Sequence, residues 1–341
     1  MSSRWFYLSL LLVTLPLTGC SSLVAGIIST PSSYPLGSPS QSPAELGYQS
    51  RRHCQGEICI PYLLAAPYQA DDPQSPPRIR YTLESEANGV ESRVHYGAER
   101  AQYGRASGTV LLLHGYRASK EAMISPSLYY RALGMKVILP DLFGHGDSRQ
   151  PMGFGAKEHQ VLGDLLDTLD RQNQLTPPVL VVGHSMGALA ASYLADTQEK
   201  VDGALLQAPM GRFDRAAASY FPYRYPTLSK LVPDSLIVDG AQRAVESAGL
   251  TLEHTDLRPF LGRTRVPVLI FGSEVDSLAP YSELESLAGD AVEVRLRPGR
   301  NHPSLMLFSQ EDAGLFEQWF FARVSDKKRA EKTPPLVVNR T

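Results

Sequence analysis

The chain has 341 residues, of which 43% are hydrophobic and 20% are charged, and its formal net charge is −2. This length and composition are typical of a globular protein with one large domain or two ordinary ones. The near-neutral charge gives no reason to expect a nucleic-acid partner. The short basic cluster at residues 327–329 lies in a polar C-terminal tail and is typical of a solvated chain end.

The N-terminus departs from this composition, because an apolar run, WFYLSLLLVTLPL, follows Arg4. The run is too short and too interrupted by proline for a membrane-spanning helix, and it is typical of a secretory signal. The next residues, LTGC at 17–20, resemble the lipobox of bacterial lipoproteins, whose cysteine carries the lipid. This resemblance implies that residues 1–20 are a lipoprotein signal peptide ending at Cys20. The alternative is an ordinary cleaved signal with a chance cysteine.

Acylation of Cys20, with palmitate for example, would tether the chain to the membrane of a bacterial cell envelope without threading it through. Because Ser21 rather than an aspartate follows the cysteine, the resemblance favours the outer membrane, on its periplasmic side or at the cell surface, over the inner membrane. The chain is therefore expected to meet a membrane through a lipid anchor.

Two further cysteines, Cys54 and Cys59, lie close together in HCQGEIC. An exported compartment is oxidising, so a small-loop disulfide is favoured over two free thiols. A zinc site is the rival interpretation, but it would need more ligands than His53 and this pair. We predict a disulfide, no metal site and no cofactor.

Residues 21–77 are predicted to form a spacer rich in serine and proline, followed by the segment that carries the cysteine pair. The part up to about residue 50 has little hydrophobic periodicity, which indicates a flexible linker between lipid and domain. A domain is predicted at 78–323, and residues 324–341 are predicted to be a polar tail.

Within 78–323, short β-rich runs alternate with helical ones. Strands are predicted at 78–83, 92–96, 109–114, 136–140, 178–183, 203–208, 266–272 and 292–297. Helices are predicted at 120–133, 156–172, 186–197, 281–289 and 311–323. The central strands are continuously apolar, as a sheet covered on both faces requires. The pattern predicts an α/β fold with a mostly parallel sheet, right-handed crossovers and helices on both faces.

Residues 211–260 interrupt this alternation, because they are too long for a simple crossover and are crowded with aromatic residues and prolines. Ligands of parallel sheets bind at the carboxyl ends of the strands. We therefore predict a small inserted cap over that edge. The alternative is a helical excursion with a tyrosine-rich surface.

The motif GHSMG places Ser185 between Gly183 and Gly187, at the end of an apolar strand and the start of a helical stretch. The glycines remove side chains that would collide where strand and helix meet at a sharp angle, and the turn exposes the serine hydroxyl. This context is that of a nucleophile elbow, and Ser185 is the predicted nucleophile.

A serine hydroxyl needs a base within hydrogen-bond reach and an acid that orients the base. In this arrangement both follow the serine along the chain. His302 in GRNHPSL follows the last predicted strand and is the predicted base, with His254 in the cap as the alternative. The acid should follow the strand at 266–272, where the loop SEVDSLAP offers Glu274 and Asp276. This loop resembles the G-x-x-D-x-x-x-P loop of many hydrolases, and the resemblance favours Asp276 as the acid, with Glu274 as the local alternative.

An oxyanion site needs two backbone N–H donors. The residue after the nucleophile, Met186, should supply one, and Tyr116 in LLLHGYRAS should supply the other. His114 and His184 could suggest a metal, but they occupy strand-end positions of these motifs, where a structural role is expected.

With the loop PDLFGHGDS at 140–148, these motifs resemble the α/β-hydrolase superfamily, specifically monoacylglycerol lipases, lysophospholipases and serine aminopeptidase-like hydrolases. The resemblance implies the fold and a serine hydrolase that cleaves a carboxylic ester, with a lipid-like or acyl ester as its small-molecule substrate. A serine aminopeptidase or amidase, an acyltransferase, and a catalytically inactive envelope binding protein remain alternatives.

Overall fold

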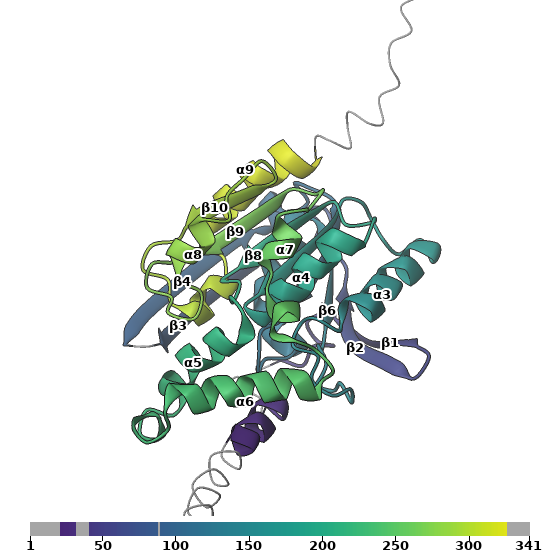
Figure 1. The fold of residues 1–341 in the computed structure, drawn as a ribbon. Coiled ribbons are helices and arrows are strands. Elements are labelled where there is room, and N and C mark those ends of the chain that lie inside the picture. The colour runs from purple at the N-terminus through teal and green to yellow at the C-terminus, as the bar shows by residue number, and fades with distance from the viewer. Residues whose placement is uncertain (1–20, 32–40, 88, 326–341) are drawn as a thin grey trace, which may run out of the picture.

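The computed structural model describes residues 21–31, 41–87 and 89–325. Its centre is an eight-stranded sheet in the order β1-β2-β6-β5-β7-β8-β9-β10 (Figure 1). The strands from β6 to β10 in this order run parallel, while β1 and β2 pair antiparallel at one edge. The predicted α/β fold with a mostly parallel sheet is confirmed.

The sheet strands are β1 (Gln49–Gln55), β2 (Ile58–Ala65), β5 (Gly108–Leu113), β6 (Met135–Pro140), β7 (Val179–His184), β8 (Gly203–Gln207), β9 (Val268–Gly272) and β10 (Val292–Leu296). The α-helices that follow residue 100 are α2 (Ile124–Leu133), α3 (His159–Arg171), α4 (Met186–Thr197), α5 (Phe213–Arg224), α6 (Asp234–Ser247), α7 (Arg258–Leu261), α8 (Tyr281–Glu285) and α9 (Gln310–Phe320). Short 3-10 helices are η1 (Arg100–Gln102), η2 (Lys120–Met123), η3 (Leu228–Lys230), η4 (Leu252–Thr255) and η5 (His302–Met306). A short π-helix, η6 (Phe321–Ser325), ends the described part of the chain. Among these and the other described helices, none is long and apolar enough to cross a bilayer.

Both faces of the sheet are buried, which explains the continuously apolar strands. In β5, Leu111 and Leu113 face one core layer, which α3 and α4 cover, whereas Val110 and Leu112 face a second layer, which α2 and α9 cover. Adjacent side chains of a strand point to opposite faces, so both sets must be apolar. The sheet is therefore packed on both faces, and the polar groups that could react lie in the loops that follow its strands.

The predicted start of the domain at residue 78 is wrong, because β1 and β2 at residues 49–65 already belong to the central sheet. The strands predicted at 78–83 and 92–96 are β3 (Arg78–Ala87) and β4 (Val90–Glu99), which form a separate two-stranded sheet. β1 was not predicted because it is a largely exposed edge strand without apolar periodicity. β2 was not predicted because Pro61 interrupts its pattern.

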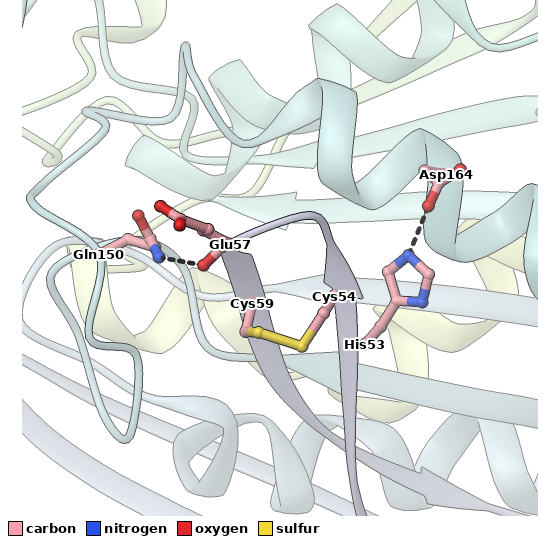
Figure 2. Close-up of a disulfide and its surroundings, with 6 residues drawn as sticks. All are labelled: His53, Cys54, Glu57, Cys59, Gln150 and Asp164. Carbon is pink, nitrogen blue, oxygen red and sulfur yellow. Dashed lines mark hydrogen bonds and ion pairs between the residues drawn. A yellow bond between two sulfur atoms is a disulfide. The ribbon is translucent and has the colours of Figure 1, made fainter.

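The β1–β2 hairpin is closed by a disulfide between Cys54 and Cys59, as Figure 2 shows. The imidazole Nε2 of His53 lies 2.8 Å from a carboxylate oxygen of Asp164 on α3. His53 and the two cysteines are therefore engaged elsewhere, which removes the rival zinc interpretation for them. Among the residues that the structure describes, no group of three or more His, Cys, Asp or Glu residues could hold a metal ion.

The predicted flexible linker is wrong for residues 21–29, which are helical and lie against α6 (Figure 1). A Cβ on Gly240 of α6 would come within 2.4 Å of a methyl group of Val24, so glycine permits this close contact. Tertiary contacts with α6 thus order a stretch whose composition predicts a coil. The signal peptide and Cys20 lie outside the described residues, as do residues 326–341 of the predicted tail.

The interval 211–260 forms a helical cap. α5 and α6 pack against each other and are joined through η3, and η4 leads towards α7. Phe213 and Ala241 belong to the core layer beneath them, on the face covered by α4. Helices α5 and α6 lie at the end of the sheet where the parallel strands finish (Figure 1).

Candidate active site

Ser185 occupies a sharp turn between β7 and α4, with φ 54° and ψ −117°. A non-glycine residue with positive φ is strained, and such strain persists where the surrounding structure fixes it. A Cβ on Gly183 would lie 2.2 Å from the carbonyl oxygen of Gly187, and one on Gly187 would lie 2.3 Å from that of Leu113. Strand and helix therefore meet so closely that both flanking residues must be glycine.

His302 lies between Ser185 and Asp276. Its Nε2 is 2.9 Å from Oγ of Ser185, and its Nδ1 is 2.8 Å from Oδ2 of Asp276. The three residues follow β7, β9 and β10, so the parallel sheet brings them to one edge. With the imidazole proton on Nδ1, facing the carboxylate, the lone pair of Nε2 can accept the serine proton.

Asp276 is held firmly in this position. The residue is 3% exposed, and Oδ1 accepts hydrogen bonds from the backbone N–H groups of Leu278 at 2.9 Å and Ala279 at 3.2 Å. These bonds leave Oδ2 directed at the imidazole. A carboxylate fixed in this way can set the tautomer and orientation of the histidine.

Glu274 and His254, the alternative acid and base, form hydrogen bonds to other residues. The carboxylate of Glu274 accepts hydrogen bonds from the Gly299 N–H at 3.0 Å and the Ser273 hydroxyl at 3.2 Å. His254 lies in η4, where its Nδ1 accepts a hydrogen bond from the N–H of Thr251 at 3.0 Å. The structure thus brings Asp276 and His302 to Ser185 and engages Glu274 and His254 elsewhere.

The two predicted oxyanion donors flank Ser185. Met186 is the first residue of α4, whose N-terminal end carries a partial positive charge. Tyr116 lies two residues past His114, in the loop after β5, and a Cβ on Gly115 would come within 3.2 Å of Cβ of Ser185. The backbone before Tyr116 therefore runs directly against the serine turn, and an oxyanion formed at Ser185 would lie near both segments.

His184, for which a structural role is expected, makes a contact that the sequence did not reveal. Its Nε2 lies 3.0 Å from the backbone carbonyl of His302, and burial, followed by the nearby His302, lowers the pKa of His184 to about 3. A neutral imidazole can donate this hydrogen bond, which ties the loop of His302 to the residue before the nucleophile. The strand-end position alone carries no signal of that contact.

Asn301 holds the same loop from its other side. Its side chain accepts a hydrogen bond from the N–H of Ser304, and this bond caps η5. Its Nδ2 donates hydrogen bonds to the backbone carbonyls of Ser85 and Val90, each at 2.9 Å. The β3–β4 hairpin is thereby fastened to the loop that carries His302. Asn301 was not among the predicted site residues, although its place directly before His302 was the available signal.

The loop at 140–148 shapes the site without reaching Ser185. Asp141 is fully buried, and its Oδ2 accepts hydrogen bonds from Nζ of Lys120 at 2.7 Å and from the N–H of Asp147 at 2.8 Å. Burial raises the pKa of Asp141, although the hydrogen bonds from Lys120 oppose that rise. A Cβ on Gly146 would collide with this carboxylate at 2.2 Å, which accounts for the glycine.

A cavity of about 550 Å³ opens at Ser185 and His302. This volume lies within the range of small-molecule sites. Its walls are largely apolar and aromatic, and the cap contributes Phe213, Ala216, Ala217, Tyr220, Phe221 and Ile237. The arrangement can therefore present a nucleophilic hydroxyl to a molecule with an apolar part.

Comparison with solved structures gives the same fold. An esterase of Pyrococcus furiosus superposes with a TM-score of 0.60 at 16% identity, over 86% of this chain and 98% of that one. A 2,6-dihydroxy-pseudo-oxynicotine hydrolase gives 0.55 at 13% identity, over 82% and 69%. An acylaminoacyl peptidase of Pyrococcus horikoshii gives 0.50 at 12% identity, over 82% and 42%. At these identities the similarity establishes the fold alone.

Two curated relatives, Epoxide hydrolase 2 and Epoxide hydrolase 3 of Siraitia grosvenorii, are 34% and 35% identical to this chain over 85 residues. The match spans 25% of this chain and about a quarter of the length of each relative. The family model described as "Alpha/beta hydrolase family" matches residues 110–338, which carry Ser185, Asp276 and His302. With the elbow, the sheet order and this match, the chain belongs to the alpha/beta hydrolase family.

Proposed function

We propose that this hydrolase cleaves carboxylic esters with Ser185 as nucleophile, His302 as general base and acid, and Asp276 as the residue that orients the imidazole. The observation that carries the proposal is the placement of His302, with one ring nitrogen 2.9 Å from the serine oxygen and the other 2.8 Å from the carboxylate. That relay is the arrangement that activates a serine hydroxyl at neutral pH.

The reaction has two steps, acylation of Ser185 and hydrolysis of the acyl-enzyme. Oγ of Ser185 attacks the acyl carbonyl while Nε2 of His302 takes the hydroxyl proton. The oxyanion accepts hydrogen bonds from the N–H groups of Met186 and Tyr116, and the imidazolium then protonates the leaving alcohol as the ester C–O bond breaks. Water, deprotonated by the same imidazole, hydrolyses the acyl-enzyme and releases the acid and free serine.

The cavity supports an acyl ester over a substrate with a free amine. An aminopeptidase needs carboxylates that hold the substrate's ammonium group. Among the described residues that line the cavity, Asp276 is the single carboxylate, and it faces His302. In the cap, Asp214 is paired with Arg212 at 2.7 Å and Asp256 with Arg258. An apolar acyl group therefore fits the walls better than an ammonium group does.

The test uses the purified full chain and a fluorophosphonate probe, with Ser185→Ala as the matched control. Wild type should be labelled and the variant should not. Turnover is then measured on acyl esters of graded chain length, on aminoacyl amides, on an alcohol acceptor and on an epoxide. Cleavage of esters supports the proposal, whereas cleavage of amides alone would make the protein a peptidase or amidase, and transfer to the alcohol would make it an acyltransferase.

Labelling that survives in Ser185→Ala would contradict the assigned nucleophile. Absence of both labelling and turnover in wild type would favour an inactive envelope binding protein. Turnover of the epoxide alone would give the chain the activity named for its two relatives from Siraitia grosvenorii and would overturn the ester assignment.

We further propose that lipid on Cys20 tethers the protein to the bacterial envelope, in the outer membrane. The support is the sequence alone, an apolar run followed by LTGC and Ser21. Growth of the producing bacterium with an alkyne-labelled palmitate should label wild type and not Cys20→Ser. Release of wild type into the soluble fraction, without label, would contradict the tether.

A further inference from the structure

The helix at residues 21–29 contacts the cap from outside the α/β core. Ser21 is 2% exposed, and the side chains of Ala25 and Ile28 pack against the core layer that contains α4. Its contact with α6 is as close as the backbone permits, because a Cβ on Gly240 would meet Val24 at 2.4 Å and the carbonyl oxygen of Ser21 at 3.1 Å. The segment is thus seated on the molecule by specific packing.

The same segment forms part of the cavity wall. Val24, Ile27 and Ile28 line the cavity that Ser185 and His302 also line, and Thr30 and Pro31 continue the wall. The sequence of residues 21–31, SSLVAGIISTP, contains no charged side chain. The wall that this segment contributes is therefore uncharged, and cap residues such as Phe221 contribute apolar side chains to the same cavity.

The segment is also joined to the loop beside the nucleophile. The hydroxyl of Tyr116 donates a hydrogen bond of 3.0 Å to the backbone carbonyl of Ile28. The ring of Tyr116 packs edge-on against Phe213 and Tyr220 of α5. One residue therefore connects the helix at 21–29, the cap and the backbone next to Ser185.

We propose that residues 21–31 complete a subsite for the acyl chain of the substrate, so that this segment, and not the cap alone, sets acyl-length preference. The proposal rests on the proposed ester hydrolysis and names its substrate class as esters of long, unbranched, uncharged acyl groups. An acyl chain that extends from Ser185 and passes between Ile28 and the cap would contact apolar side chains on both sides. Its methylene groups would thereby be removed from water. Each methylene so buried should raise kcat/KM about fourfold until the subsite is full.

The helix offers a matched pair of positions for the test. Ile28 lines the cavity, whereas Leu23 is 67% exposed and does not. The full chain carrying Ile28→Trp, which fills the subsite, is compared with Leu23→Trp, which adds the same side chain on the outer face. The measurement is the ratio of kcat/KM for a dodecanoyl ester to that for the acetyl ester of the same alcohol.

Ile28→Trp should lower this ratio at least tenfold, and Leu23→Trp should leave it within twofold of wild type. Gly240→Val, which pushes Val24 away from α6, should lower the ratio as well, because it displaces the whole wall. Ile28→Ala provides a milder change in case tryptophan unfolds the segment, and it should shift the preferred chain length upwards. An unchanged ratio in Ile28→Trp, Ile28→Ala and Gly240→Val would overturn the subsite.

Failure of the subsite is distinguishable from failure of the proposed function. If fluorophosphonate labels Ser185 and acetyl ester is cleaved, but the ratio is the same in every variant, the subsite alone is wrong. If wild type neither labels nor cleaves esters, the ester hydrolysis is wrong. Calorimetric binding of dodecanoate then still tests the subsite, which predicts weaker binding to Ile28→Trp than to Leu23→Trp and is overturned by equal binding or none.

Discussion

Two regions meet at the cavity, and different forces hold them. The sheet edge positions Asp276 with two backbone N–H groups and His302 with the ring of His184, all through directional hydrogen bonds. The cover, made of α5, α6 and residues 21–31, presents mainly apolar contacts to the cavity. Every residue of β7 is buried, whereas α5 buries only Phe213, Asp214 and Phe221. In the proposed reaction, directional hydrogen bonds fix the position of the catalytic groups, and the looser apolar packing of the cover selects the substrate.

The sharpest way to break this comparison is His302→Ala. If the sheet edge carries the chemistry, turnover of every ester should fall by about 10³-fold or more, and the loss should lie in kcat. Steady-state kinetics on acetyl and dodecanoyl esters measure it. Similar factors for both chain lengths are expected, because the imidazole transfers protons with the serine hydroxyl and the leaving alcohol and does not contact the acyl tail.

The matched control is His254→Ala, in the cap. Its imidazole contacts the N–H of Thr251 and not Ser185, so turnover should stay close to that of wild type. The reverse result, with His254→Ala inactive and His302→Ala active, would move the base to the cover and overturn the division between the two regions.

A second test compares two carboxylates of one loop. Asp276→Asn keeps the shape but removes the charge facing the imidazole, and it should lower kcat by about 10²–10⁴-fold. Glu274→Gln, whose carboxylate accepts bonds from Gly299 and Ser273, should keep turnover within a few-fold. Equal losses in both variants would show that the loop fold, and not one carboxylate, is what the site requires.

This difference also explains how much of the site the sequence could predict. Ser185 and its glycines were predictable because a strand-to-helix turn of this tightness excludes a Cβ at both flanking positions. A local steric demand leaves a local signature. The contacts of His184 and Asn301 were not predictable, because each residue bonds to backbone carbonyls of a segment remote in sequence. His184 bonds to the carbonyl of His302, and Asn301 bonds to those of Ser85 and Val90.

The fold divides in the same way. β5 and β7 were predictable, because burial on both faces selects an unbroken apolar run, VLLL in β5 and VLVV in β7. β1 was not, because an edge strand with the sequence QSRRHCQ owes its conformation to pairing with β2. The helix at 21–29 was predicted as linker, since its order depends on contact with Gly240, more than 200 residues further along the chain.

A third test concerns the stability of the sheet edge. Burial lowers the pKa of His114 to about 4 and those of His145 and His184 to about 3, so the folded chain keeps them neutral where the unfolded chain protonates them. Their stabilisation is complete above about pH 6.5 and is lost as the pH falls towards 3 to 4. Burial raises the pKa of Glu158 to about 7, so this residue binds a proton in the folded state that it lacks in the unfolded state. Its effect on the pH dependence of stability therefore cancels that of one of the three histidines.

The free energy of unfolding should therefore fall by about 2 kcal/mol per pH unit between pH 6.5 and 5. Urea unfolding at a series of pH values measures the slope. His145→Asn should reduce it by about 1 kcal/mol per unit, because one titrating group is gone. A slope that is unchanged in this variant would mean that His145 is protonated in the folded protein.

The smallest effect is expected in the cover, from Phe221→Ala. Phe221 is 8% exposed on α5 and lines the cavity, so its removal should lower kcat/KM for a dodecanoyl ester about tenfold, mainly through KM, and much less for an acetyl ester. Its control is Phe271→Ala in β9, 1% exposed in the sheet, which should cost about 3–5 kcal/mol of unfolding free energy. Equal losses on both esters in Phe221→Ala would mean that the cover positions the catalytic groups, and the two regions would then act as one.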